Sequence, residues 1–335
     1  MFSYPVLLGD IGGTNARFAL AARRGGSLSA TVRLKTNDFA KPADGLREAA
    51  SRLGSQPMSV ILCAAGPVSG RSVALTNAGW RIDGPALAEA LGLEQGLLFN
   101  DFEALALALP ALPAAAFRHL GGGPHPAALH SGAAMTVIGA GTGLGAAALV
   151  ATGRRYLALP SEAGHASLAA QGELETEIFH LAARECGRVS AETFLSGPGL
   201  ERLHRLRIKV EGVIAAGGVT ASEISQIAAR EPASHAARSL SLFWRLLGRF
   251  AGDIGLVHLA RGGVVLSGGL IEHLAPALDE GEFLAAFRDK GPMAELAASL
   301  PVSLLVKSDP VLAGMAAMAA DPAQYAIDFA NRMWR

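Results

Sequence analysis

The chain has 335 residues, of which 50% are hydrophobic and 17% are charged, and its 29 basic and 29 acidic residues balance to a formal net charge of zero. A charged share below the usual value of about 25% excludes a disordered chain. Zero net charge leaves no global field that would attract nucleic acid or an anionic membrane. Any function that depends on charge must therefore come from a local site, and the length predicts two domains or one large one.

The first part of the chain alternates apolar runs, turns and helical patterns. A strand over 6–8 ends at the glycine-rich stretch 9–14, and a second strand over 16–21 follows it. This pattern predicts strands at 32–35, 59–65, 72–75 and 97–99, and helices at 45–53 (with Asp44 as a cap), 85–91 and 102–109. Such alternation is typical of an α/β fold.

The opening pattern recurs after a proline- and glycine-rich boundary at 110–126. A strand over 135–138, a turn from Gly139 to Gly143 and a strand over 146–150 predict an internal duplication of one supersecondary unit. Strands are expected at 156–159, 263–267 and 302–306, and helices at 172–183, 191–206, 222–230, 233–259 and 311–320. The stretch 131–153 is uncharged and long enough to span a bilayer, but its glycines favour two buried strands.

The two cysteines, Cys63 and Cys186, are too few for a disulfide framework and lack the spacing of a zinc site. Both are expected in the core, and a reducing, cytoplasmic location is expected. The apolar N-terminus has no basic region and Asp10 interrupts it, which argues against a signal peptide.

Two turns rich in glycine and threonine are candidate phosphate sites, because glycine lets backbone N–H groups point into a concavity. A carboxylate does not bind phosphate favourably, so Asp10 fits such a site only through a cation such as Mg²⁺ held through water. Ordinary glycine-rich hairpins are the alternative. The candidate residues are Gly9, Asp10, Ile11, Gly12, Gly13 and Thr14 in the first turn, and Gly141, Thr142 and Gly143 in the second.

The second turn also permits a different interpretation. The stretch 141–146, GTGLGA, fits a variant of the dinucleotide-binding fingerprint, and Glu162 lies at a suitable distance for a ribose contact. A dehydrogenase therefore stays an alternative, although it leaves the first turn unexplained.

Asn100 and Asp101 follow a buried strand, at the sheet edge where ligands bind in open α/β folds. Asp101 could accept the proton of a hydroxyl that attacks a phosphoryl group. The alternative is that one of the two residues caps the following helix.

Three further residues are suited to a sugar, whose hydroxyls both donate and accept hydrogen bonds. Glu162 and His165 are expected on a loop, where functional residues often lie, and Glu192 on a helix. Gly268 and Gly269 follow the buried strand 263–267 and would let a flat base lie against the backbone, although a plain strand-to-helix turn explains them equally well.

Nine segments together resemble the ATP-dependent bacterial glucokinase family, in the group without the cysteine-rich zinc motif. They are LLGDIGGTNARFAL (7–20), CAAGPVSG (63–70), LTNAGW (75–80), LFNDFEALA (98–106), GAGTGLG (139–145), LPSEAGHASLA (159–169), ETFLSGPGL (192–200), SLFWRLLGRFAGDIGL (241–256) and VVLSGGL (264–270). The sequence departs from the family in having Ala163 where a glycine is usual, and 321–335 extends beyond the usual end.

The resemblance implies an actin-like, hexokinase-type α/β fold of two domains around a cleft. The small domain would comprise 1–111 and about 303–321, the large domain 112–302, and 322–335 a C-terminal tail. It also implies ATP with Mg²⁺ as donor and D-glucose as acceptor, with Asp101 as catalytic base. Asn100, Glu162, His165 and Glu192 match the family's sugar-binding residues, and Gly9 to Thr14 match its ATP-phosphate segment.

A homodimer through the larger domain is also implied. A kinase for mannose or fructose stays an alternative on the same fold. A non-catalytic sugar sensor is the other alternative, but the first strand begins near Val6 and leaves no room before it for a helix-turn-helix. ADP or polyphosphate in place of ATP is not excluded.

Overall fold

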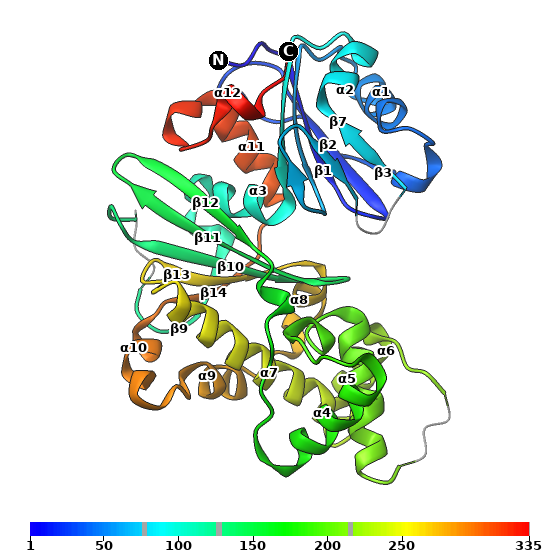
Figure 1. The fold of residues 1–335 in the computed structure, drawn as a ribbon, viewed down its shortest axis with the longest axis vertical. Coiled ribbons are helices and arrows are strands. Elements are labelled where there is room, and N and C mark those ends of the chain that lie inside the picture. The colour runs from blue at the N-terminus through cyan, green and yellow to red at the C-terminus, as the bar shows by residue number, and fades with distance from the viewer. Residues whose placement is uncertain (76–78, 125–128, 214–216, 335) are drawn as a thin grey trace. The chain divides into compact units, whose positions relative to one another are not determined.

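The computed structural model describes residues 1–75, 79–124, 129–213 and 217–334 (Figure 1). Part of the LTNAGW motif (76–78) and part of the predicted boundary loop (125–126) lie outside these residues. The chain forms two compact units. Unit 1 comprises Met1–Ala114, Leu149–Pro160 and Lys307–Arg335, and unit 2 comprises Ala115–Ala148 and Ser161–Val306. The domain boundaries expected from the sequence stay a prediction.

The first sheet belongs to unit 1 and has the strand order β3-β2-β1-β4-β8. Its strands are β1 (Val6–Ile11), β2 (Asn15–Ala21), β3 (Val32–Lys35), β4 (Ser59–Ala64) and β8 (Gln95–Asn100). β1 is antiparallel to β2 and parallel to β4, which is parallel to β8. The predicted hairpin at the start of the chain is therefore confirmed, and β8 is an edge strand.

Helices cover both faces of this sheet (Figure 1). α1 (Pro42–Arg52) and α2 (Gly84–Leu91) lie on one face, and α3 (Asp101–Ala108) and α11 (Pro310–Ala320) on the other. A small antiparallel sheet of β5 (Val68–Ser69), β6 (Ser72–Ala74) and β7 (Arg81–Asp83) precedes α2, and the short α12 (Phe329–Arg332) ends the chain's helices. β4, which an apolar run predicted, is buried along its whole length, as expected for a strand that lies between two others.

The second sheet has the order β12-β11-β10-β13-β14-β9. Its strands are β9 (Phe117–Gly121), β10 (Ala134–Ala140), β11 (Leu144–Thr152), β12 (Arg155–Ser161), β13 (Gly263–Ser267) and β14 (Val302–Leu305). β10 pairs in parallel with β13, as β1 does with β4. The five strands from β12 to β14 thus repeat the order of the first sheet, which agrees with the duplication predicted from the two hairpins.

The helices of unit 2 pack around α7 (His235–Val257), a helix of 23 residues that buries one broad, mainly apolar face. α7 contacts α5 (Gly197–Val210), α6 (Ala221–Arg230), α9 (Glu280–Arg288) and α10 (Ala294–Ser299). The other helices are α4 (Gly172–Cys186) and α8 (Gly269–Leu274). This helical layer supplies most of the core that holds β10 and β13 in place.

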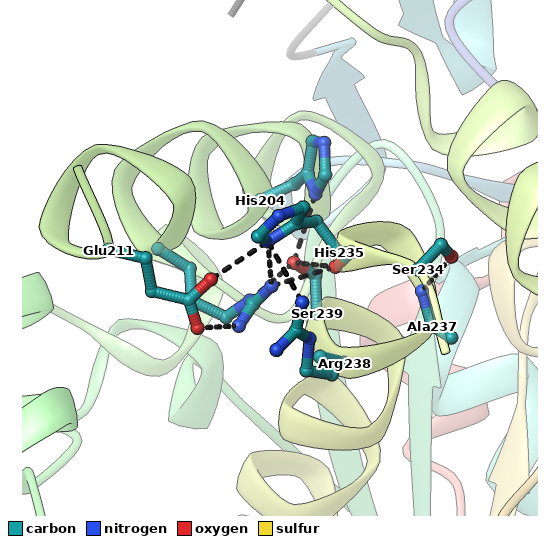
Figure 2. Close-up of polar contacts among 8 residues, drawn as sticks. His204, Glu211, Ser234, His235, Ala237, Arg238 and Ser239 are labelled. Atoms are coloured by element: carbon teal, nitrogen blue, oxygen red, sulfur yellow. Dashed lines mark hydrogen bonds and ion pairs between the residues drawn. The ribbon is translucent and has the colours of Figure 1, made fainter. Parts of the chain in front are cut away.

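A polar network joins α5 to α7 (Figure 2). His235 Nδ1 lies 2.8 Å from Glu211 Oε2, and Arg207 Nε donates to Ser239 Oγ at 2.9 Å. His204 Nδ1 lies 2.9 Å from the same hydroxyl, and burial lowers the pKa of this histidine. The network contains none of the predicted site residues, and its contacts tie the two helices together.

Three local predictions are wrong. Cys186, which was expected in the core, is exposed at the end of α4. Asp44 lies in the first turn of α1, and Lys41 is the N-cap, since Pro42 supplies the pre-set φ of a first helical residue. The helix predicted over 191–206 is interrupted, because a 3₁₀ turn over Ala191–Thr193 precedes α5, which begins at Gly197. Ser196 caps α5 by accepting from the Gly199 N–H, so Glu192 lies before the helix.

Among the described residues, no helix is both long and apolar enough to cross a membrane. The uncharged stretch at 131–153 forms β10 and β11.

Candidate active site

The first glycine-rich turn connects β1 to β2 in unit 1. Only Gly12, Gly13 and Thr14 form the turn, because Gly9 and Ile11 are buried within β1. A Cβ at Gly9 would lie 2.7 Å from Leu62, so this glycine serves packing. Thr36 fixes the turn: its N–H donates to the Thr14 carbonyl at 3.0 Å, and its hydroxyl donates to the Gly13 carbonyl at 2.6 Å.

Parallel pairing brings three polar groups to one end of the first sheet. Asp10 lies opposite Cys63, and Ala64 lies opposite Asn100, the last residue of β8. Asp101 follows directly as the first residue of α3. The carboxyl ends of parallel strands are where open α/β sheets bind ligands, so Asp10, Asn100 and Asp101 lie where such a site is expected.

Asp10 is a partly buried carboxylate with two neighbours that stabilise its charge. Arg17 Nη1 lies 3.7 Å away, and the Cys63 Sγ lies 3.4 Å from its Oδ1. Burial raises the pKa of Asp10, and Arg17 and Cys63 oppose that rise. Burial, followed by the nearby charge of Asp10, raises the pKa of the Cys63 thiol well above its ordinary value, so this cysteine is a protonated donor at neutral pH.

Asn100 is the N-cap of α3, as one sequence interpretation predicted. Its Oδ1 accepts from the N–H groups of Phe102 at 3.0 Å and Glu103 at 3.2 Å, and its Nδ2 donates to the Gly66 carbonyl at 3.1 Å. The side chain is therefore held rigidly at the end of β8. A sugar-binding role for it stays a prediction.

Asp101, like Asp10, has a raised pKa at this end of the sheet. Burial raises its pKa from 3.8 to about 6, and the charge of Asp10 adds to the rise. The N–H of Phe102 donates to its Oδ1 at 3.0 Å and opposes the rise. A carboxylate with a pKa near 6 is ionised at pH 7 yet basic enough to accept a proton.

The second glycine-rich turn joins β10 to β11 in unit 2. The Gly141 N–H donates to the Gly143 carbonyl at 2.9 Å, and the Gly197 N–H donates to the Gly141 carbonyl at 2.8 Å. Neither Gly141 nor Gly143 has a positive φ. A Cβ at Gly141 would meet nothing within 4 Å, so this position leaves open space at the turn.

The dinucleotide interpretation of this turn is wrong. A Rossmann fingerprint needs a helix directly after the glycines, because the pyrophosphate binds at the helix N-terminus. Here the strand β11 begins at Leu144 instead.

Glu192 contacts the second turn directly. Its Oε2 accepts from the Leu144 N–H at 2.8 Å, and a Cβ at Gly143 would lie only 2.6 Å from the same oxygen. The glycine therefore leaves the space that the carboxylate fills.

Glu162 and His165 lie on the loop after β12, at the two ends of a short 3₁₀ turn. Their side chains are exposed, and His165 Nε2 lies 3.9 Å from Glu162 Oε2. A Cβ at Gly164 would lie 1.9 Å from the Leu144 carbonyl oxygen, so the loop packs on the start of β11. The Ala191 N–H donates to the Ala166 carbonyl, which brings Glu162, His165 and Glu192 into one region of unit 2.

Gly268 also borders this region, because β13 pairs with β10. Its φ is 103°, and a Cβ would lie 2.4 Å from the Ala140 carbonyl oxygen. Only glycine fits there. Gly269, the first residue of α8, has open space around it.

The predicted site residues thus fall into two groups. One lies in unit 1 at the end of β1, β4 and β8, and the other lies in unit 2 around the β10–β11 turn.

Sequence reasoning missed three residues of the first group. Cys63 was expected to be a core residue and is buried, but it also donates to Asp10. Asp309 Oδ1 lies 3.4 Å from Arg17 Nη1, and Asp309 has a φ of 49°, which is unfavourable for a residue other than glycine. Cys63 opens the motif CAAGPVSG and Arg17 lies within the motif LLGDIGGTNARFAL, but neither residue was assigned to the site, and no sequence signal marked Asp309.

Comparison with known proteins agrees with this arrangement. The family model named Glucokinase matches residues 7–322. A glucokinase of Rhizobium meliloti (strain 1021) is 37% identical over 340 residues, which cover 100% of this chain and 97% of that protein.

Two solved structures are similar over nearly the whole chain. A glucokinase from an Antarctic psychrotroph has a TM-score of 0.82 and 32% identity, covering 95% of this chain and 99% of that one. A glucokinase from Streptomyces griseus in complex with glucose and AMPPNP has a TM-score of 0.62 and 21% identity, covering 95% and 98%. The mixed α/β structure is therefore of the actin-like, hexokinase type, and the chain belongs to the glucokinase family.

Proposed function

We propose that Asp101 acts as the general base while the chain transfers the γ-phosphoryl group of ATP to the 6-hydroxyl of D-glucose. As a member of the glucokinase family, the chain is an ATP-dependent glucose kinase. The observation that supports the role of Asp101 is its place at the end of β8, with a pKa of about 6. The glucose and the nucleotide analogue AMPPNP in the Streptomyces griseus structure support the same pair of reactants.

In phosphoryl transfer the protein mainly positions the reactants and stabilises the negative charge of the transition state. The sugar oxygen attacks the γ-phosphorus in line, the bond from that phosphorus to the bridging oxygen breaks, and ADP leaves. Asp101 accepts the proton of the 6-hydroxyl, which raises the nucleophilicity of the oxygen. Its partial burial removes competing water from the carboxylate and keeps its proton affinity high.

The sugar-binding residues proposed are Asn100, Glu162, His165 and Glu192. Glu162 and His165 have exposed side chains, whose polar atoms are accessible to sugar hydroxyl groups. Glu192 is held by the Leu144 N–H through one oxygen, Oε2. Its other oxygen, Oε1, is proposed to accept from a sugar hydroxyl.

Glu192→Ala is expected to raise the KM for glucose about 10- to 100-fold, since a hydrogen bond to a charged group contributes about 1.5–3 kcal/mol. The matched variant Glu192→Gln keeps an oxygen that can accept from the Leu144 N–H. It is expected to show a smaller rise. Steady-state kinetics at saturating ATP measure both, and an unchanged KM in Glu192→Ala would remove this residue from the sugar site.

The two glycine turns are proposed to bind the ATP phosphates through Gly12–Thr14 and Gly141–Gly143, with Gly268 and Gly269 beside the base. Asp10 is proposed to hold Mg²⁺ through water. The nearby negative charges of Asp10 and Asp101 fit a cation, and Asp10 raises the pKa of Asp101. The described residues contain no cluster of three His, Cys, Asp or Glu side chains that could hold a metal. The carboxylates of Asp10 and Asp101 fit a hydrated Mg²⁺ ion that also binds the phosphates of ATP and lowers the repulsion between the negative charges.

A cytoplasmic location and a place at the entry to glycolysis are also proposed. Cys63 and Cys186 are free thiols, as is usual in a reducing compartment. A homodimer is proposed on the family resemblance alone.

A hexose panel tests the proposed function. Purified full-length chain with ATP and Mg²⁺ is expected to release ADP fastest with glucose, and mannose and fructose serve as competing acceptors. EDTA is expected to abolish release. Faster turnover of mannose or fructose would overturn the choice of glucose, and no ADP release with any hexose would favour a sugar-binding protein without kinase activity.

A further inference from the structure

The C-terminal segment 328–334, here called the C-terminal clasp, was expected to be a tail, but it packs into unit 1. It contains α12, whose N-cap is Asp328, and it ends in Trp334, which is fully buried. The family model ends at residue 322, so the clasp lies outside the part that the model matches.

The clasp covers the free side of the edge strand β8. The Trp334 N–H donates to the Gly96 carbonyl, and the Gly96 N–H donates to the Trp334 carbonyl, each at 3.1 Å. The indole ring fills the space beside Gly96 and Gly84, where a Cβ would lie 2.3 Å and 2.4 Å from it. This pairing satisfies backbone groups that an edge strand would otherwise leave open.

Arg332 reaches further along the same strand. Its Nη2 donates to the Leu98 carbonyl at 2.8 Å, and its guanidinium lies over the Phe99 ring at 4.7 Å. The two Nη atoms bind both oxygens of Glu103, at 2.6 Å and 2.9 Å. The side chain of Arg332 therefore binds both β8 and the first turn of α3, before and after Asn100 and Asp101 in the chain.

Both partners of this ion pair are shielded from solvent. The side chain of Glu103 is 10% exposed and that of Arg332 is 22% exposed. A two-pronged arginine–carboxylate pair fixes direction as well as distance. Leu98 and Glu103 are five residues apart, so their shared partner restrains the strand-to-helix junction between them.

We propose that Arg332 is a positioning residue for phosphoryl transfer, which holds the β8–α3 junction so that the carboxylate of Asp101 faces the attacking hydroxyl. This inference rests on the proposed role of Asp101. In this inference the clasp contributes to the reaction through Arg332, which holds the junction and does not contact substrate. A displacement of about 1 Å in a reacting group costs up to about 10²-fold in rate, so loss of this grip is expected to appear in kcat.

Arg332→Met tests the proposal, because it keeps an unbranched apolar side chain and removes the charge, the donors and the contact of the guanidinium with Phe99. We expect kcat at 25 °C to fall at least about tenfold, with the KM for ATP changed less than about twofold. The two turns proposed for ATP follow β1 and β10, whereas these contacts of Arg332 are with β8 and α3. Arg332→Lys, which keeps the charge but lacks the fork, is expected to be intermediate.

A second variant covers the case in which Arg332→Met fails to fold because Glu103 is left buried without a partner. Arg332→Met with Glu103→Gln removes both charges, and its kcat is expected to stay at least about fivefold below that of the original chain. Arg205→Met is the matched control, since Arg205 binds both oxygens of Glu185 in unit 2. It is expected to leave kcat unchanged.

The outcomes separate three cases when Asp101→Asn is measured in parallel. If the folded Arg332 variants keep full kcat and show only lower melting temperatures, the clasp is purely structural and the proposal is overturned. If Asp101→Asn is inactive in that case, the general base still stands. If Asp101→Asn keeps its turnover, the proposed function of Asp101 fails whatever the Arg332 variants do.

Discussion

Asp101→Asn is expected to lower kcat at least about 10²-fold, the usual size of the loss when a general base is removed. The amide keeps the shape of the side chain and an oxygen that can accept from the Phe102 N–H, but it does not accept a proton at neutral pH. The measurement is ADP release at saturating glucose and ATP. Circular dichroism and a thermal melt check that the variant is folded.

The pH dependence of the original chain provides a second measure of the same group. Since the pKa of Asp101 is about 6, kcat/KM is expected to fall about tenfold per pH unit below that value, as the carboxylate becomes protonated. The residual activity of Asp101→Asn is expected to lack this decline.

The same substitution is expected to stabilise the fold. The pKa of Asp101 is raised on folding from 3.8 to about 6, so its contribution to stability is present below pH 4 and is lost as the pH rises through 6. At pH 7.5 the buried charge is therefore unfavourable. Asp101→Asn removes it, and the free energy of unfolding in urea is expected to rise by about 1–3 kcal/mol.

Asp83→Asn is the matched control for these measurements. Asp83 also lies at a strand-to-helix junction of unit 1, where it is the N-cap of α2, and its Oδ1 accepts from the Ala86 N–H. The control is expected to leave kcat unchanged. Turnover near that of the original chain in folded Asp101→Asn would falsify the assignment of Asp101 as the base.

Trp334→Ala is expected to lower the free energy of unfolding by about 3–5 kcal/mol, the usual cost of truncating a buried large aromatic side chain. Trp334 is 0% exposed and lies in the core formed with β1, β4 and α2. Because Gly84 and Gly96 have no side chain to fill the vacated space, the cavity collapses poorly. Urea denaturation monitored by circular dichroism measures the change.

Asn331→Ala is the control within the same segment, since Asn331 is exposed. Its effect is expected to stay within about 0.5 kcal/mol. A loss below about 1 kcal/mol in Trp334→Ala would contradict the inclusion of the C-terminal clasp in the core, because a fully buried Trp contributes more than that.

Local patterns predicted most of the elements correctly. The apolar runs at 59–65 and 263–267 became β4 and β13, and the two glycine-rich turns became hairpins, because strand periodicity and turn residues act over a few neighbours. The failures were also local. Lys41, and not Asp44, is the N-cap of α1, and Ser196 is the N-cap of α5, which begins within the helix predicted over 191–206.

The candidate site was predictable as a set of residue types but not as a set of contacts. The motifs marked Asp10 and Asp101, yet the hydrogen bond from Cys63 to Asp10 depends on the parallel register of β1 and β4. No periodicity in the chain specifies that register. The ion pair of Arg17 with Asp309 joins residues 292 positions apart, so it arises only when the chain end returns to unit 1.

The sequence by itself determined the family, the alternation of strands and helices, and the polar residues at the strand ends, because each of these depends on motifs and patterns of a few neighbouring residues. Only the tertiary structure decided the proton affinity of Asp101 and the role of the last residues, since burial and the grip of Arg332 on Glu103, 229 positions away, exist only after the chain has packed.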